Sequence, residues 1–323
     1  MIEPARTGPR RNRPALYGRR RRLLVGAVLA LLLVCTAFAA ARHPLNGTAH
    51  PLNGKARRFL SAVSWPLYGQ AALVLGSGRP VASPHERPVP IASLAKVMTA
   101  YLILERYPLS GAQDGFTITV TEAQAHVEAQ GQSVVAVRAG EPLTERQLLE
   151  ALLIPSGNNV ARMLATHVAG SESRFIGEMN AEARALAMDH TIYTDPSGFD
   201  PGTVSTAADQ LRLFRRAMRF RVFREIVSMA SVTLPVAGTL PNYNPLIAEG
   251  YAGKTGSDSA AGGCLAFFTH VTIGGRDLTA VGVVLGQGQG SDTSVILAAA
   301  GEAAKRMVES VAPAIAASTS STA

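Results

Sequence analysis

The pattern of hydrophobic and polar residues along the chain begins with one long apolar run. Leu23 to Ala41 consists of apolar and small residues, with Cys35 and Thr36 as its only mildly polar members. A helix of this length spans roughly 28 Å, which is close to the hydrocarbon thickness of a bilayer. We therefore expect residues 23–41 to form a transmembrane signal-anchor helix.

Beyond this run, apolar residues recur with the spacing of buried helices. In Ile91 to Leu104 they fall at i, i+3, i+4 and i+7 positions, which share one helix face. Thr144 and Gln147 have the spacing of a capping box that starts the next helix, and Pro155 marks its end. Similar spacing predicts further helices at 160–168, 175–188, 211–218 and 293–308.

Other segments show the short apolar runs that are typical of strands. Residues 71–75 and 80–82 surround a Gly-Ser-Gly turn and predict a hairpin, and residues 274–277 predict a turn between strands 263–272 and 278–285. Further strands are predicted at 116–120, 133–137, 232–236 and 250–257. We expect a mixed α/β (α+β) domain over residues 70–311, preceded by a linker at 42–69 and followed by a disordered tail at 312–323.

The net charge of +8 is concentrated at the N-terminus. Residues 1–22 hold eight arginines and one glutamate, a net +7 (8 − 1), which leaves about +1 (8 − 7) for the remaining chain. A domain with so small a net charge lacks the positive surface that binds nucleic acid, so we expect no nucleic-acid partner.

The arginines also predict the orientation of the apolar run. Arg19 to Arg22 favour a basic cytoplasmic tail at 1–22, so the domain would lie outside the cytoplasm, periplasmic or extracellular, as a single-pass protein of the cell membrane. Ala37-Phe38-Ala39 also fits a signal-peptide cleavage site, and cleavage there would give a secreted protein.

Ser93 and Lys96 are the first candidates for chemistry. They stand three residues apart at the start of a hydrophobic helix, so their side chains can meet on one face. A lysine that is buried and neutral beside a serine is a general base beside a nucleophile. Of the 31 Lys and Arg residues only four are lysines, and a lysine retained in such a chain suggests a role that arginine cannot fill.

Two further polar motifs follow at places suited to a rigid site. Ser156 and Asn158 lie on a tight connection between two predicted helices. Lys254 and Thr255 lie in a predicted strand between Gly253 and Gly256, and glycine in a strand often marks the close approach of another backbone.

Taken together, Ser-x-x-Lys, Ser-x-Asn and Lys-Thr-Gly form the ordered motif set of penicillin-binding proteins and class A β-lactamases. From about Gln70 to Met307 the chain resembles the low-molecular-weight penicillin-binding proteins, the serine-type D-alanyl-D-alanine carboxypeptidases. The contexts IASLAKVMTA, LLIPSGNN, TDPSGFD, NYNPL and GKTGSDSAAGG support the resemblance. It implies a β-lactamase/transpeptidase-like fold, an antiparallel sheet flanked by helices with an all-helical subdomain.

The resemblance also implies an activity and roles for the motif residues. The protein would remove the terminal D-Ala from peptidoglycan stem peptides that end in D-Ala-D-Ala, and β-lactam antibiotics would inhibit it by acylating the same serine. Ser93, Lys96 and Ser156 would be catalytic, with Ser93 as the acylated nucleophile. Substrate would be bound by Asn158, Lys254, Thr255, Gly256 and Ser257, and the backbone amides of Ser93 and Ser257 would form the oxyanion hole.

Two departures from the family pattern and three alternatives accompany this interpretation. Asn159 stands where Asp is frequent, and the chain ends soon after its last helix, without the second β-rich domain of some members. A D,D-endopeptidase remains open. A β-lactamase-like hydrolase lacks a Glu-x-x-x-Asn motif between Asn158 and Lys254, and a binding-only homologue would be expected to lose Ser93 or Lys96. The seven histidines are scattered, so we expect neither metal nor cofactor.

Overall fold

The computed structural model describes residues 63–320 apart from 274, 289 and 291. The predicted cytoplasmic tail and transmembrane run therefore lie outside the described residues. Within the described part, none of the helices combines the length and hydropathy needed to cross a membrane.

A five-stranded antiparallel sheet in the order β2-β1-β11-β10-β9 forms the larger β structure of the domain. Its strands are β1 (Gln70–Leu75), β2 (Val81–Ala82), β9 (Ala252–Asp258), β10 (Gly262–Ile273) and β11 (Arg276–Gln287). Both predicted hairpins are present, since β1 pairs with β2 and β10 pairs with β11. Strand β9 pairs only with β10 and is an edge of the sheet.

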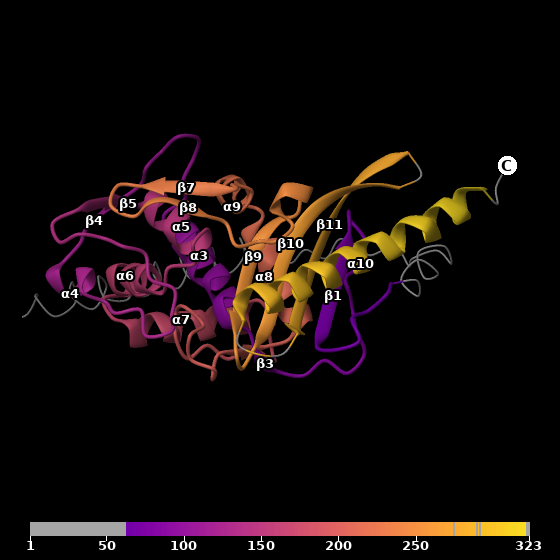
Figure 1. The fold of residues 1–323 in the computed structure, drawn as a ribbon, viewed down its shortest axis with the longest axis horizontal. Coiled ribbons are helices and arrows are strands. Elements are labelled where there is room, and N and C mark those ends of the chain that lie inside the picture. The colour runs from indigo at the N-terminus through magenta and orange to yellow at the C-terminus, as the bar shows by residue number, and fades with distance from the viewer. Residues whose placement is uncertain (1–62, 274, 289, 291, 321–323) are drawn as a thin grey trace, which may run out of the picture. The chain divides into compact units, whose positions relative to one another are not determined.

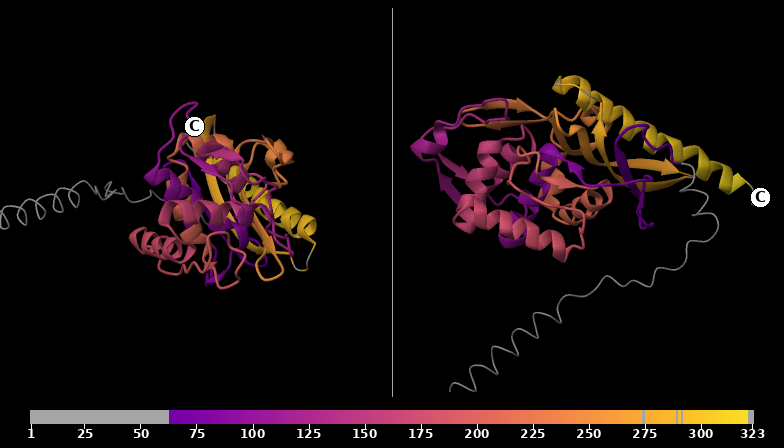
Figure 2. Two further views of the ribbon diagram at one scale, coloured as in Figure 1. Left: turned by 90° about the vertical axis from the view of Figure 1, so that its left-hand side faces the viewer. Right: turned by 90° about the horizontal axis from the view of Figure 1, so that it is seen from below.

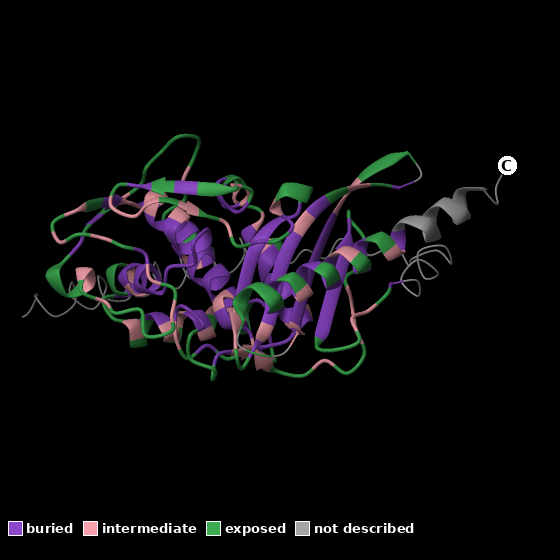
Figure 3. Ribbon diagram, viewed as in Figure 1, coloured by how far each residue is buried: buried purple, intermediate pink, exposed green. Residues whose placement is uncertain are grey.

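Alternating side chains of the sheet are buried in two separate cores. Ala72 and Val74 of β1 belong to the core shared with α3 (Ala95–Arg106) and α8 (Ala207–Ala217). Their neighbours Leu73 and Leu75 belong to the core under α10 (Thr293–Ser320). A strand that is covered on both faces has a continuous apolar sequence, as residues 71–75 (AALVL) of β1 do. Figures 1 and 2 show α10 lying across the sheet, and Figure 3 shows the strands buried beneath it.

A group of helices completes the domain on the far side of α3 from the sheet (Figure 1). It contains α4 (Glu122–Ala125), α5 (Glu145–Leu153), α6 (Asn158–Ala169) and α7 (Glu172–Ala185). The capping box between Thr144 and Gln147 starts α5 as predicted, and Gly170 ends α6 in the left-handed conformation. This mixed architecture agrees with the predicted fold class.

Small elements connect the two parts. The short strands form three two-stranded sheets, with β3 (Val89–Pro90) against β6 (Val204–Ser205), β4 (Thr117–Thr119) against β5 (Pro142–Thr144), and β7 (Ser231–Leu234) against β8 (Gly238–Pro241). The helix α9 (Arg221–Val227) and the 3-10 turns η1 (Ala92–Leu94) and η2 (Ile247–Glu249) complete the described elements.

Three sequence predictions need correction. Residues 133–137 form no strand, because Val135 exchanges its backbone hydrogen bonds with the side chain of Asn159 and not with another strand. The tail predicted as disordered from residue 312 continues α10 to Ser320, and its alanines favour an existing helix. Val63, predicted within the linker, is buried in the core under α10.

Candidate active site

Ser93 and Lys96 meet at the junction of η1 and α3. Ser93 lies in the 3-10 turn η1, which forms the start of the helix predicted over Ile91 to Leu104, and Lys96 is in the first turn of α3. The Lys96 Nζ donates a hydrogen bond to Ser93 Oγ over 2.7 Å. The residue before the serine, Ala92, has a φ of +46°, a conformation that non-glycine residues rarely adopt.

Lys96 is enclosed by acceptors and has no exposed surface (0 %). Its Nζ donates to Asn158 Oδ1 over 2.7 Å and to the Ser197 carbonyl over 2.9 Å. Among the described residues no carboxylate lies within ion-pair distance of this amine. Burial, followed by the charge of Lys254, holds the pKa of Lys96 well below its ordinary value, and the charge of Asp195 acts in the opposite direction. Burial therefore favours the unprotonated amine, the form that can accept a proton.

A second buried lysine lies on strand β9, next to Thr255 of the cleft. Lys254 of β9 is only 1 % exposed, and its Nζ donates to Ser156 Oγ over 3.0 Å and to the Thr255 carbonyl over 2.8 Å. Burial lowers its pKa to about 7. Ser156 therefore lies beside one lysine while Ser93 lies beside the other.

Ser156 is held in place by a strained connection between α5 and α6. Its φ of +64° lies in the left-handed region, where a serine costs of order 1 kcal/mol or more. The following Gly157 leaves no room for a side chain, since a Cβ there would come within 2.8 Å of Val135 Cγ2. The expectation of a tight and rigid connection at Ser156 and Asn158 is met by this geometry.

The glycines around Lys254 bring β9 against neighbouring backbones. A Cβ on Gly256 would lie 2.8 Å from the Ile91 carbonyl oxygen and 3.2 Å from the Ser93 nitrogen. A Cβ on Gly253 would lie 2.0 Å from the Ala266 carbonyl oxygen of β10. Only glycine allows this packing, so the close approach predicted from the sequence is confirmed at both positions.

A cleft of about 290 Å³ opens along the edge strand β9. Thr255, Gly256 and Ser257 form one wall, and Ser93 and Ser156 lie beside them. The remaining lining residues are Ser133, Tyr243, Thr293 and Leu297. No carboxylate is among these described lining residues, and no group of three or more His, Cys, Asp or Glu side chains in the described chain is placed to hold a metal ion.

Sequence reasoning missed one group that contacts Lys96. The turn from Asp195 to Phe199, which the sequence analysis uses only as the TDPSGFD context, supplies the Ser197 carbonyl to Lys96. Its Pro196 carbonyl also accepts a hydrogen bond from Thr99 Oγ1 of α3 over 2.6 Å. The TDPSGFD motif draws attention to this segment, but a pattern of residue types does not show where a backbone carbonyl points.

Comparisons with known proteins agree with this site. Residues 76–288 match the model of the Peptidase_S11 family, D-alanyl-D-alanine carboxypeptidase. A D-alanyl-D-alanine carboxypeptidase of Mycobacterium tuberculosis is 35 % identical over 53 % of this chain and 59 % of its own length. A D-alanyl-D-alanine endopeptidase of Escherichia coli is 31 % identical over 63 % of this chain and 67 % of its own.

A solved structure extends the likeness to the fold. The crystal structure of the Streptomyces K15 DD-transpeptidase superposes with a TM-score of 0.65 at 25 % identity, covering 77 % of this chain and 99 % of that one. The match to the Mycobacterium tuberculosis relative spans about three-fifths of that protein's length. The motif geometry, the family match and the shared fold together show that this chain belongs to the S11 family of serine D-alanyl-D-alanine carboxypeptidases.

Proposed function

We propose that this protein is a serine D,D-carboxypeptidase that releases the terminal D-Ala from peptidoglycan stem peptides ending in D-Ala-D-Ala. The observation that supports it most is the 2.7 Å hydrogen bond between Ser93 Oγ and a fully buried Lys96 without a carboxylate partner. A serine beside an unprotonated amine is an activated nucleophile.

In the proposed first step, Ser93 Oγ attacks the carbonyl carbon of the D-Ala-D-Ala bond while Lys96 takes its proton. Ser156, beside Lys254, then relays the proton that Lys96 took to the nitrogen of the leaving D-Ala, so the peptide bond breaks and an ester forms on Ser93. Water hydrolyses the ester and restores the serine. Backbone amides of Ser93 and Ser257 are the proposed donors to the developing oxyanion.

Substrate selection is assigned to the wall formed by β9. Lys254 and Thr255 would bind the C-terminal carboxylate by charge-assisted hydrogen bonds, and Asn158 would hold the peptide backbone. Strand β9 is an edge of the sheet, and Gly256 and Ser257 line the cleft beside it. An extended peptide can therefore add alongside it as a further strand.

Mass spectrometry of the products from a pentapeptide ending in D-Ala-D-Ala tests this proposal. The wild-type protein should release one D-alanine and leave a tetrapeptide, and Ser93→Ala should release none. An intact pentapeptide after prolonged incubation with correctly folded wild-type protein would overturn the proposal.

A second candidate activity, D,D-endopeptidase, is favoured by one observation. The Escherichia coli relative at 31 % identity is named an endopeptidase, and so is a Pseudomonas aeruginosa relative at 33 % identity. Competition between the pentapeptide and a cross-linked peptide dimer in one assay decides between them. Faster loss of the dimer would assign the endopeptidase activity.

We also propose that residues 23–41 anchor the protein in the cell membrane with its catalytic domain outside the cytoplasm. The support is the apolar run and the arginines before it. The full chain should pellet with membranes and resist extraction by high salt, which removes proteins held by surface charge alone. A soluble mature protein starting at Ala40 would instead show cleavage after Ala39.

A further inference from the structure

The turn at Asp195–Phe199 touches the catalytic segment at three places. Its Ser197 carbonyl accepts from Lys96 Nζ, and its Pro196 carbonyl accepts from Thr99 Oγ1. Gly198, with a φ of +79°, packs so closely that a Cβ would lie 1.8 Å from the Ala92 carbonyl oxygen. The turn thus contacts the residue before Ser93 as well as the lysine that activates it.

One carboxylate holds this turn in shape. Asp195 Oδ2 accepts hydrogen bonds from the backbone nitrogens of Ser197 and Phe199, each over 3.1 Å, and from Ser197 Oγ over 2.5 Å. Its Oδ1 accepts from the Gly198 nitrogen and from Thr203 Oγ1, each over 3.0 Å. Five donors on one side chain fix both the turn and the direction of the Ser197 carbonyl.

The same carboxylate provides the negative charge that acts on Lys96. The groups that face the amine are Ser93, Asn158 and the Ser197 carbonyl, with the Lys254 charge across the site. Burial and Lys254 lower the pKa of Lys96, and Asp195 raises it. Because a stronger base takes the serine proton more readily, the charge of Asp195 favours the proton transfer that burial and Lys254 oppose.

We propose that Asp195 is a positioning residue for the reaction: it fixes the Ser197 carbonyl against the Lys96 amine and, by its charge, sets how readily that amine accepts the Ser93 proton. The inference rests on the proposed role of Lys96 as the base. Asp195 lines no part of the described cleft, and it acts through the turn and through its charge.

Asp195→Asn tests the proposal, since asparagine keeps the size of the side chain and removes the charge. Asp200→Asn is the matched control, because it makes the same change five residues on, where the carboxylate accepts from the Gly202 nitrogen and has no bond to the turn. We expect Asp195→Asn to lower kcat/KM by about ten- to a hundredfold, part of the usual general-base contribution, with little change in KM. Asp200→Asn should change neither constant.

A direct titration separates this inference from the proposed function. With only four lysines in the chain, labelling the lysine side chains with ¹⁵N should give few enough amine signals to follow Lys96, assigned with Lys96→Arg. Its midpoint should move to lower pH in Asp195→Asn and stay in place in Asp200→Asn, whether or not any peptide is cleaved.

An unmoved Lys96 midpoint in a folded Asp195→Asn protein would overturn the inference, and so would a loss of thermal stability with an unchanged kcat/KM. Should Asp195→Asn fail to fold, Thr203→Val removes one of the five donors and keeps the charge. It should lower kcat/KM with KM unchanged, and wild-type activity in this variant would also overturn the proposal.

Discussion

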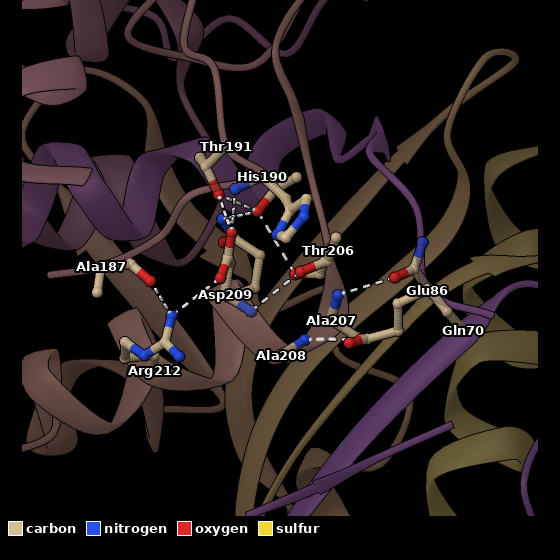
Figure 4. Close-up of polar contacts among 12 residues, drawn as sticks. Gln70, Glu86, Ala187, His190, Thr191, Thr206, Ala207, Ala208, Asp209 and Arg212 are labelled. Carbon is tan, nitrogen blue, oxygen red and sulfur yellow. Dashed lines mark hydrogen bonds and ion pairs between the residues drawn. The ribbon is translucent and has the colours of Figure 1, made fainter. Parts of the chain in front are cut away.

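Two buried polar regions of this domain differ in whether their charged side chains have a partner of opposite charge. In the candidate active site two lysines, Lys96 and Lys254, are buried without a carboxylate in ion-pair distance among the described residues. At the N-terminus of α8 a buried carboxylate, Asp209, accepts from the His190 nitrogen and Thr191 Oγ1, each over 3.0 Å, and pairs with Arg212 over 2.9 Å (Figure 4).

The α8 region also satisfies the backbone groups that a helix start leaves free. The nitrogens of Ala207, Ala208 and Asp209 donate to the side chains of Gln70, Glu86 and Thr206, respectively (Figure 4). These acceptors come from three separate segments, so the network joins β1, the loop before β3 and α8.

The paired carboxylate in the α8 region stabilises the fold. The two lysines, which have no ion-pair partner in the described part of the chain, reduce its stability, and the proposed reaction uses both of them. A buried ion that is paired and hydrogen-bonded is costly to disrupt, whereas an unpaired one is held at a cost to stability. Substitutions in the two regions should therefore have opposite effects on activity and stability.

The largest effect is expected from Lys96→Met. Loss of the base should reduce D-alanine release by about a thousandfold or more, while the melting temperature rises, because an apolar side chain of similar length replaces a buried amine without an ion-pair partner. Lys305→Met, which removes an ion pair with Glu249 at the surface, is the control and should change neither quantity much. A lower melting temperature for Lys96→Met would contradict the comparison.

Asp209→Ala should have the opposite effect to Lys96→Met: it should lower stability and leave activity unchanged. It removes the acceptor of the His190 nitrogen and one of the two partners of both Thr191 Oγ1 and Arg212, so we expect a loss of about 3 kcal/mol in the free energy of unfolding. The folded fraction should keep a normal kcat. Urea unfolding measures the loss, and Asp209→Asn, which retains an acceptor oxygen, should lose less. Equal stability of the wild type and Asp209→Ala would remove the distinction between the two regions.

The effect of Lys254→Met on thermal stability should depend on pH, because Lys254 is also buried without an ion-pair partner among the residues described. The folded pKa of Lys254 is about 7 and its ordinary value is 10.5, so between these values the unfolded chain binds more protons. Wild-type stability should then rise with pH across this window. The gain in melting temperature of Lys254→Met over wild type should be largest below pH 7 and fade towards pH 10.5. A gain that is the same at every pH would argue against the lowered pKa.

The smallest effect is expected at Glu86, in the α8 region. Burial, as the main cause, raises the pKa of this carboxyl, so its folded form binds a proton more readily and stability falls as pH rises through that pKa. Glu86→Gln keeps an acceptor for the Ala208 nitrogen. It should raise stability at pH 7 by less than about 1 kcal/mol, the usual scale for a partly exposed charge, and have no effect at acid pH. Thermal melts at pH 4 and pH 7 check this.

Much of this arrangement follows from local sequence patterns. The hydrophobic spacing predicts α3, α5, α6 and the hairpins of the main sheet, because burial of one or both faces repeats along each element. The meeting of Ser93 with Lys96 also follows, since three residues separate them on one helical turn. Glycine at 253 and 256 indicates the tight packing of β9 because no other residue fits.

Other features depend on contacts between distant segments. Residues 133–137 have a strand-like composition, but their backbone partner is the side chain of Asn159. Here the amide matters, since it both accepts from the Val135 nitrogen and donates to the Val135 carbonyl, which an ionised Asp could not do. The Ser197 carbonyl and its support by Asp195 depend in the same way on turn geometry, which residue types alone do not specify.

Intact-protein mass spectrometry after mixing with benzylpenicillin tests most directly whether Ser93, activated by Lys96, is the nucleophile. The wild type should gain one penicilloyl group, mapped to Ser93, and Ser93→Ala should gain none while it unfolds at nearly the same temperature. The adduct should last for minutes or longer, because the leaving nitrogen of the β-lactam stays tethered to the acyl group and blocks water, whereas D-alanine diffuses away. No carboxylate among the described lining residues is placed to direct water onto the ester. An adduct of equal yield on Ser93→Ala, or penicillin hydrolysis at tens of turnovers per second, would contradict the account.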